Sequence, residues 1–544
     1  MRNLLKKKLV IPITVGVIFL TGTAFQSKFF EIAKQIEIFT TMFKELNMNY
    51  VDETNPGDLM DTAIKGMLND LDPYTVFMNE QDVEAARINS TGDYIGIGAS
   101  VKTLKDRLVV VEPYKDYAAD KAGLKAGDEI IMIEGIDLAT FKGDPGDLLR
   151  GSPGSKVTLT YQRQGKSNSA TITRQEVESK AVPLYDMVND KVGYIALSKF
   201  TRTASRETAN ALRELKAGGA QTLILDLRGN PGGLLLEAVN IVNLFVPKGQ
   251  LVVTTKSKVE KYNKTYFTLN QPLDLNIPLV VLIDGGSASA SEIVSGSLQD
   301  LDRAVIIGTR SFGKGLVQRP KALTYGTQLK VTISRYYTPS GRCIQALDYW
   351  NRDEEGNAVR TQQKNFNEFK TKNGRSVFDG GGIQPDIEIE DAKLSTITKA
   401  VESGDYIFNY ATSYYYNNSI SDMLAFKLSD NDFKDFKTYL KRGGFNFKTK
   451  TETQLAIALD IAKDENIESA LTGDYNKLIA SLNSYKDRAV DDNKTQITSL
   501  LENEIIKRYF YREGLYEYYL SHNKEIKTAV DILGNKGRYN SYLN

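Results

Sequence analysis

Hydrophobic residues change their spacing several times along this chain of 544 residues, and each change predicts a different kind of structure. Within residues 28–91, apolar residues recur every three to four positions, which is the period of an α-helix. The members of this pattern are Ile32, Ile36, Phe39, Phe43 and Leu46. A second run of the same kind covers residues 59–71. We therefore expect an N-terminal helical region at residues 28–91.

Between residues 92 and 180 the apolar runs become short, rich in Val and Ile, and separated by glycines and other turn residues. Such runs are typical of strands in a small β-rich domain. The candidate strands lie at residues 94–101, 108–111, 129–133 and 157–161.

Residues 181–390 alternate continuous apolar runs with amphipathic segments, which predicts an α/β layer whose strands are buried on both faces. We expect strands at residues 192–197, 222–227, 279–284 and 304–308 and helices at residues 204–217, 235–245 and 290–301. From residue 391 to residue 544 helical spacing returns, and we expect a helical C-terminal accessory region with a structural role. The whole is an α/β multidomain protein.

Composition narrows the function. Hydrophobic content of 41% and charged content of 25% are ordinary for a globular protein, and a formal net charge of +1 argues against nucleic-acid binding. Cys343 is the only cysteine, so no disulfide can form within the chain and stability must come from the core.

The N-terminus predicts export. Arg2 and three lysines at residues 6–8 precede an apolar run at residues 9–20, and small residues follow at residues 21–24. A basic segment, a short apolar core and small residues are the features of a secretory signal. Residues 1–27 are thus a signal peptide or, if uncleaved, a membrane anchor, and both alternatives stay open. We expect a periplasmic or cell-envelope protein.

Two glycine-flanked segments carry candidate chemistry. Residues 286–292 read Gly-Ser-Ala-Ser-Ala-Ser-Glu, and residues 312–318 read Phe-Gly-Lys-Gly-Leu-Val-Gln. A serine becomes a nucleophile only when a base takes its proton, and the single histidine, His522, lies far away in the C-terminal region. A lysine is then the expected base, provided that burial lowers its pKa from about 10.4. Which of the three serines reacts and which caps the following helix cannot be decided from these residues.

Residues 118–130, which include Ala-Gly-Leu-Lys-Ala-Gly-Asp, resemble the core of a bacterial PDZ domain. Gly96, Ile97 and Gly98 then resemble its carboxylate-binding loop, where backbone N–H groups converge on the end of a peptide that adds as a strand. Arg150 has two readings, as a partner of the peptide carboxylate or as a solvated surface arginine.

The order of these segments, with Asp-Leu-Arg-Gly-Asn-Pro-Gly-Gly at residues 226–233 between them, resembles the carboxyl-terminal processing (tail-specific) serine peptidases, which have a crotonase-like α/β core. The likeness covers about residues 35–390. It implies that Ser289 is the nucleophile, that Lys314 is the general base, and that Gln318 orients the lysine amine. Gln318 is four residues after Lys314, and one helical turn would bring it to the same side. The likeness further implies an oxyanion hole made by Ala290 with Gly232 or Gly233.

We therefore expect an exported serine endopeptidase with a Ser–Lys dyad that reads free C-terminal ends of protein or peptide substrates. No cofactor, metal or nucleic acid is implied, and contact with a membrane is expected only through the N-terminal segment. One alternative is a PDZ-containing scaffold that binds peptides without cleaving them. Another is a phosphate-binding loop at residues 308–315, but Gly315 stands where such a loop needs Ser or Thr.

Overall fold

The computed structural model describes residues 29–104, 106–354, 356–389 and 394–544. They fall into two compact units, one formed by residues 29–79 and Pro320–Val331 and the other by the described residues of Glu80–Arg319 and Thr332–Asn544. The predicted signal or anchor at residues 1–27 lies outside the described residues. Among the residues described, no helix combines the length and apolar content that a membrane crossing requires.

The first unit confirms both helices expected near the N-terminus. One runs through residues 29–49, and α2 spans Pro56–Asn69. Helix α2 begins three residues before the apolar run at residues 59–71, because the Asn55 side chain caps it by accepting hydrogen bonds from two backbone N–H groups and Pro56 occupies the first turn. Strand β1 (Val76–Met78) pairs antiparallel with residues 328–330. The apolar stripe of the helix at residues 29–49, which includes Ile32 and Ile36, is exposed in the single chain.

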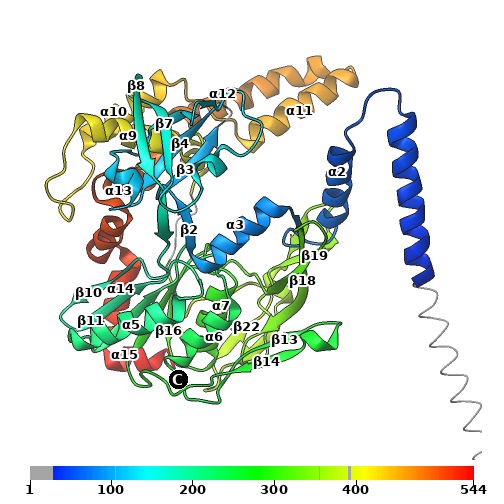
Figure 1. The fold of residues 1–544 in the computed structure, drawn as a ribbon. Helices are drawn as coiled ribbons and strands as arrows, with labels where there is room; N and C mark the ends of the chain where they lie inside the picture. The colour runs from blue at the N-terminus through cyan, green and yellow to red at the C-terminus, as the bar shows by residue number, and fades with distance from the viewer. Residues whose placement is uncertain (1–28, 105, 355, 390–393) are drawn as a thin grey trace, which may run out of the picture. The chain divides into compact units, whose positions relative to one another are not determined.

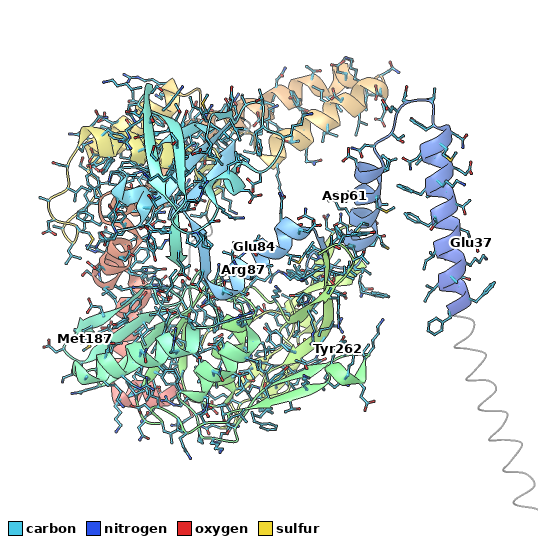
Figure 2. The ribbon with its side chains drawn as sticks, viewed as in Figure 1. Glu37, Asp61, Glu84, Arg87, Met187 and Tyr262 are labelled. Carbon is cyan, nitrogen blue, oxygen red and sulfur yellow. The ribbon has the colours of Figure 1, made fainter. Side chains whose placement is uncertain are left out.

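The second unit begins with α3 (Glu80–Thr91). On this helix Arg87 and Glu84, which lie about one turn apart, form an exposed ion pair at 2.7 Å (Figure 2).

A β-rich domain follows, as the sequence predicts. A six-stranded sheet has the order β3-β4-β5-β7-β8, with β6 paired to β5, so that β3 is an edge strand; β2 and β9 form a separate antiparallel pair (Figure 1). The elements are β2 (Asp93–Gly96), β3 (Ala99–Leu104), β4 (Arg107–Pro113), α4 (Ala118–Lys121), β5 (Glu129–Ile133), β6 (Ile136–Asp137), η1 (Pro145–Leu149), β7 (Lys156–Arg163), β8 (Lys166–Thr173) and β9 (Gln175–Glu178).

The α/β domain is built on a second six-stranded sheet, of order β10-β11-β12-β15-β16-β23, in which every pair except β10–β11 is parallel. Its strands and helices are β10 (Leu184–Asn189), β11 (Val192–Ala196), α5 (Ala204–Ala217), β12 (Thr222–Asp226), α6 (Leu235–Asn243), β15 (Leu279–Ile283), α7 (Ala290–Asp300), β16 (Val305–Gly308) and β23 (Ile387–Glu388).

A further sheet contains β13 (Leu251–Lys256), β14 (Lys264–Phe267), β17 (Leu316–Ala322) and β18 (Gln328–Tyr337). Small elements complete the domain: η2 (Glu260–Tyr262), η3 (Gln363–Asn365), and the hairpins β19 (Leu347–Arg352) with β20 (Ala358–Arg360) and β21 (Glu368–Lys370) with β22 (Ser376–Phe378).

The C-terminal region is helical, and its helices are α8 (Thr396–Ser403), α9 (Tyr406–Asn417), α10 (Asp430–Arg442), α11 (Lys450–Asp464), α12 (Glu468–Asp492), α13 (Lys494–His522), α14 (Lys524–Gly534) and α15 (Lys536–Ser541). Helix α13 breaks at Tyr511, whose φ is 60°. At the break, the Tyr511 hydroxyl donates to Asp120 at 2.7 Å and Arg512 pairs with Glu112 at 2.9 Å, so α13 contacts the β-rich domain.

Alternate residues of the parallel strands enter two different cores. On one face, Leu225, Val281 and their neighbours pack with α5, α6 and α7. On the other face, Ile224 and Val280 pack with α14 and α15, which come from the last residues of the chain (Figure 1). The side chains that these two helices contribute are Ile526, Ala529, Ile532, Leu533 and Tyr539. The end of the helical region therefore forms one layer of the α/β domain.

Replacing Ile532 with alanine tests this layer. Ile532 is fully buried against the sheet, and removal of its methyl groups should cost about 2–5 kcal/mol of the free energy of unfolding of the α/β domain. Hydrogen exchange at the amides of β12 and β15 measures this loss locally. Asp531→Ala, at the exposed neighbouring position, should change it by less than about 0.5 kcal/mol. Unchanged exchange in Ile532→Ala would show that α14 does not stabilise the sheet.

Candidate active site

The three serines of the segment at residues 287–291 have different environments. The Ser287 hydroxyl donates to the Leu227 carbonyl at 2.8 Å, and the Ser291 hydroxyl donates to the Asn230 carbonyl at 2.9 Å. Both side chains are fully buried, whereas Ser289 is partly exposed. Ser289 is thus the serine of this segment that a substrate can reach.

Ser289 lies in the turn between β15 and α7 with φ 54° and ψ −107°. Its positive φ is unusual for a residue other than glycine and stores strain. A serine at a strained strand-to-helix turn presents its hydroxyl at the surface, next to the N–H of the following residue. That residue, Ala290, is the first of α7, where backbone N–H groups have no acceptor within the helix.

The segment at residues 229–233, which we call the glycine loop, lies against this turn. A Cβ atom added to Gly232 would stand 2.7 Å from the Ala288 carbonyl oxygen and 2.9 Å from the Ala290 nitrogen. A Cβ on Gly233 would collide with the Phe200 carbonyl. Both glycines also have positive φ, so the close approach of the two backbones depends on them.

The two N–H groups of this pair differ. The Gly232 N–H donates to the Asn230 side chain at 2.9 Å. The Gly232 carbonyl accepts from the Phe200 N–H, and because the two ends of a trans peptide unit point in opposite directions, the Gly233 N–H points away from Phe200. Within the described part of the chain it donates to no acceptor.

A buried carboxylate connects the serine turn to the lysine segment. Glu292 Oε2 accepts from the N–H of Ser289 at 2.7 Å and from the N–H of Lys314 at 2.9 Å. Glu292 Oε1 accepts from the Ser311 hydroxyl at 2.6 Å and from the Gly313 N–H at 2.7 Å. Burial raises the pKa of Glu292, while these four donors oppose that rise. The carboxylate therefore fixes both segments relative to each other. The Lys314 side chain is half-buried.

Gln318 departs from the sequence expectation. We predicted one helical turn between it and Lys314, but residues 316–322 form β17, so the helical assumption is wrong. In the structure the Gln318 amide nitrogen donates to the Thr332 hydroxyl at 3.2 Å. The same strand excludes a phosphate-binding loop at residues 308–315, which requires a helix at this point.

In the β-rich domain, the segment at residues 96–98 turns its carbonyls inward. Ile97 O accepts from the Ala119 N–H at 2.7 Å, so the Gly98 N–H of the same peptide unit points outward. The Ile97 side chain is buried in the domain core, and only its backbone can face a peptide. Gly98 has positive φ, and a Cβ there would collide with Tyr117. Arg150 forms an exposed ion pair with Asp147 at 2.9 Å.

Comparison with known proteins agrees with the division of the chain into an N-terminal region, a β-rich domain, an α/β domain and a helical C-terminal region. The model of peptidase family S41 matches residues 191–349, and the PDZ domain model matches residues 95–173. The model "Activating protease CtpB N-terminal domain" matches residues 22–82, and "Probable PDZ-protease, C-terminal helical domain" matches residues 397–533.

The carboxy-terminal-processing protease of Bartonella bacilliformis is 37% identical over 321 residues, which are 58% of this chain and 73% of that protein. The chain belongs to peptidase family S41. A probable CtpA-like serine protease of Staphylococcus haemolyticus is 28% identical over 480 residues, or 86% of this chain and 88% of that protein. The solved photosystem II D1 C-terminal processing protease is 27% identical, with a TM-score of 0.37, over 65% of this chain and 88% of that one. The family assignment rests on the sequence relatives.

Two residues of this S41 site were not recognised in the sequence. Glu292 was read only as part of the serine motif, and Asn230 only as part of the glycine segment. Asn230 is fully buried, its side chain donates to the Leu197 carbonyl at 2.6 Å, and its own carbonyl accepts from the Ala288 N–H at 3.0 Å. A signal for Glu292 existed, because a glutamate three residues after a serine at a helix start can accept from the serine N–H.

Glu292→Gln should lower the kcat of the S41 enzyme by about a hundredfold or more, because its amide group would face backbone donors and shift Ser289 relative to Lys314. Steady-state kinetics on an unstructured protein measures the effect. Ser311→Ala is the matched control, since it removes one of the four donors and leaves the carboxylate. Its decrease in kcat should be smaller than that of Glu292→Gln. Wild-type kcat in Glu292→Gln would contradict the role of this carboxylate.

Proposed function

We propose that the chain is an exported serine endopeptidase that cuts proteins at or inward from their C-terminal ends, with Ser289 as nucleophile and Lys314 as general base. The observation that carries this proposal is the environment of Ser289. It is the accessible serine of its segment, it occupies a strained turn at the start of α7, and it adjoins the glycine loop. Membership of a family of C-terminal-processing serine proteases supports the reaction class.

In the first step the neutral amine of Lys314 takes the proton of the Ser289 hydroxyl as Oγ bonds to the substrate carbonyl carbon. The carbonyl electrons move to oxygen, and the oxyanion is stabilised by backbone donors. We assign these donors to the N–H groups of Ala290 and Gly233, because the Gly232 N–H already donates to Asn230. The positive end of α7 adds to this stabilisation.

In the second step the Lys314 ammonium group gives its proton to the leaving nitrogen as the C–N bond breaks. One product departs with a new amino end, and the other stays as an ester on Ser289. Water then loses a proton to Lys314 and attacks the ester, and the returning proton restores the Ser289 hydroxyl. We assign the amide oxygen of Gln318 as the acceptor that orients the lysine amine, since its nitrogen is held by Thr332.

The PDZ domain would supply substrate recognition. Gly98 presents an outward N–H to a peptide carboxylate, and the free edge of β3 can accept the peptide as an additional strand. Ile95 and Val101, both half-buried beside the loop, favour apolar terminal residues. Export is proposed from the basic and apolar character of residues 1–24, and the segment is either cleaved or kept as an anchor.

Ser289→Ala should lower kcat by at least about 10⁴-fold without loss of stability, since only the nucleophile is removed. Ser291→Ala should keep kcat within about tenfold and instead lower the stability by roughly 1 kcal/mol, through the lost bond to Asn230. Mass spectrometry of the products from a tailed protein and thermal unfolding measure the two effects. Activity in Ser289→Ala, with its loss in Ser291→Ala, would sink the assignment.

The same assay tests the base. Lys314→Ala and Lys314→Arg should both be inactive, because arginine cannot be deprotonated in a protein. In the wild type kcat should rise with pH, since the neutral form of the amine is the reactive one and its fraction grows as pH rises. If Lys314→Ala kept kcat and its dependence on pH while His522→Ala lost activity, the lysine-base model would be overturned.

Amidation of the substrate's C-terminus should weaken both binding and cleavage, because the carboxylate that faces the loop at residues 96–98 is lost. Isothermal titration with a peptide and cleavage of a protein carrying the same tail provide the readings. A terminal Asp or Lys in place of an apolar residue should act in the same direction. Equal cleavage of free-acid and amidated substrates would show that the C-terminus is not recognised.

A further inference from the structure

Arg228 joins the glycine loop to the far end of the chain. It lies two residues after β12 and directly before Gly229, and its guanidinium contacts both carboxylate oxygens of Asp226, the nearest at 2.6 Å. Nη1 of the same group donates to Asn523 Oδ1 at 2.9 Å and to Glu525 Oε2 at 3.2 Å, across 295 and 297 positions of sequence. One side chain thus connects the loop beside Ser289 with the start of α14.

The near side of this contact is rigid. Asp226 is almost fully buried, accepts from the Arg228 N–H at 2.9 Å, and accepts from the Tyr194 hydroxyl at 2.7 Å. Burial acts to lower the pKa of Arg228, but the carboxylates of Asp226 and Glu525 raise it overall, so the guanidinium stays charged. Burial and the Asp226 carboxylate likewise raise the pKa of Tyr194, whose hydroxyl remains a donor.

The far side is rigid as well. Asn523 caps α14, since its side chain also accepts from the Ile526 N–H at 3.0 Å. Helix α14 is fixed to the sheet by its buried apolar face. In α15, the Tyr539 hydroxyl contacts the backbone N–H and carbonyl of Leu279 at 2.9 and 3.2 Å, where β15 begins. Asn523 and Glu525 therefore hold Arg228 from a fixed support.

A movement of Arg228 would be passed to the surroundings of Ser289 through a few neighbouring residues and hydrogen bonds. The residue before it, Leu227, accepts the Ser287 hydroxyl, and the residue after it, Gly229, donates to Asp284 at 2.8 Å. Beyond them stand Asn230, which binds the serine turn, and the two glycines that adjoin Ser289. A shift of the loop by a fraction of an ångström would misplace the Gly233 N–H.

We propose that Arg228 is a positioning residue for the glycine loop and that Asn523 and Glu525, at the start of α14, hold it in place. The C-terminal helices would then act in catalysis through this contact as well as in folding. This inference rests on the proposed function, because it assigns the loop a part in stabilising the oxyanion. Loss of the contact between Glu525 and Arg228 would then change turnover and leave peptide binding at the PDZ domain unchanged.

The test compares Glu525→Ala with Asp531→Ala in the full chain. Both changes remove one carboxylate from α14, but Asp531 is exposed and has no contact with Arg228. The double variant Asn523→Asp with Glu525→Ala puts a carboxylate back beside Nη1, and aspartate can still cap the helix. Glu525→Gln, which keeps the side-chain length and removes the charge, repeats the comparison with the smallest change in packing. Readouts are kcat and KM on a tailed protein and hydrogen exchange at residues 229–233.

Glu525→Ala should lower kcat by between about tenfold and about a hundredfold with KM unchanged, as expected for a small misplacement near the reacting atoms. Exchange at residues 229–233 should become faster. Asp531→Ala should match the wild type, and the double variant should recover most of kcat. Equal kcat in Glu525→Ala and Asp531→Ala, or a loss of kcat that the double variant does not recover, would overturn the proposal.

These outcomes are distinct from a failure of the proposed function. That failure would appear in the wild type, as turnover that is absent or that survives Ser289→Ala. Hydrogen exchange at residues 229–233 tests the hold on the loop even in that case, because it needs no turnover. Unchanged exchange in Glu525→Ala would then refute the link by itself.

Discussion

The geometry of the candidate active site depends on one buried carboxylate. Glu292 is fully buried and accepts four hydrogen bonds, from the backbone of Ser289, Gly313 and Lys314 and from the Ser311 hydroxyl. Removing a carboxylate from water costs several kcal/mol, and this cost is offset only when its oxygens find strong donors. Position within the first turn of α7 helps further, because the positive end of a helix favours an anion. Moving the lysine segment away would take the donors of Ser311, Gly313 and Lys314 from this charge.

A second constraint is that the parallel sheet has two apolar faces to cover. Helices α5 to α7 cover one face, and α14 and α15 cover the other. Because the second cover comes from the end of the chain, the helical region cannot be separated from the α/β domain without exposing the side chains around Ile224 and Val280. The preceding helix, α13, contacts the PDZ domain through Tyr511 and Arg512. The three parts of this unit are therefore linked by one continuous stretch of sequence.

Much of this fold could be predicted because its signals are local. Residues 129–133 and 204–217 form β5 and α5 with the predicted bounds, since a short apolar run and helical spacing are properties of consecutive residues. The helical turn expected before Gln318 was wrong because β17 is determined by pairing with β18, which a local pattern cannot reveal. The contact of Glu292 with the lysine segment escaped notice for a similar reason, because Lys314 lies 22 positions away. Arg228 escaped because its partners stand at the opposite end of the sequence.

The alternation of serine and alanine at residues 287–291 has a physical explanation in the structure. Ser289 adopts a backbone conformation that costs about 1–3 kcal/mol, so its neighbours must hold it there. Ser287 and Ser291 do this by donating to two different carbonyls, of Leu227 and Asn230, and each such bond contributes about 0.5–1.5 kcal/mol. The two contributions are of the size of the strain. Both carbonyls belong to the segment that contains the glycine loop, so the bonds that hold Ser289 in its strained conformation also set the loop beside it.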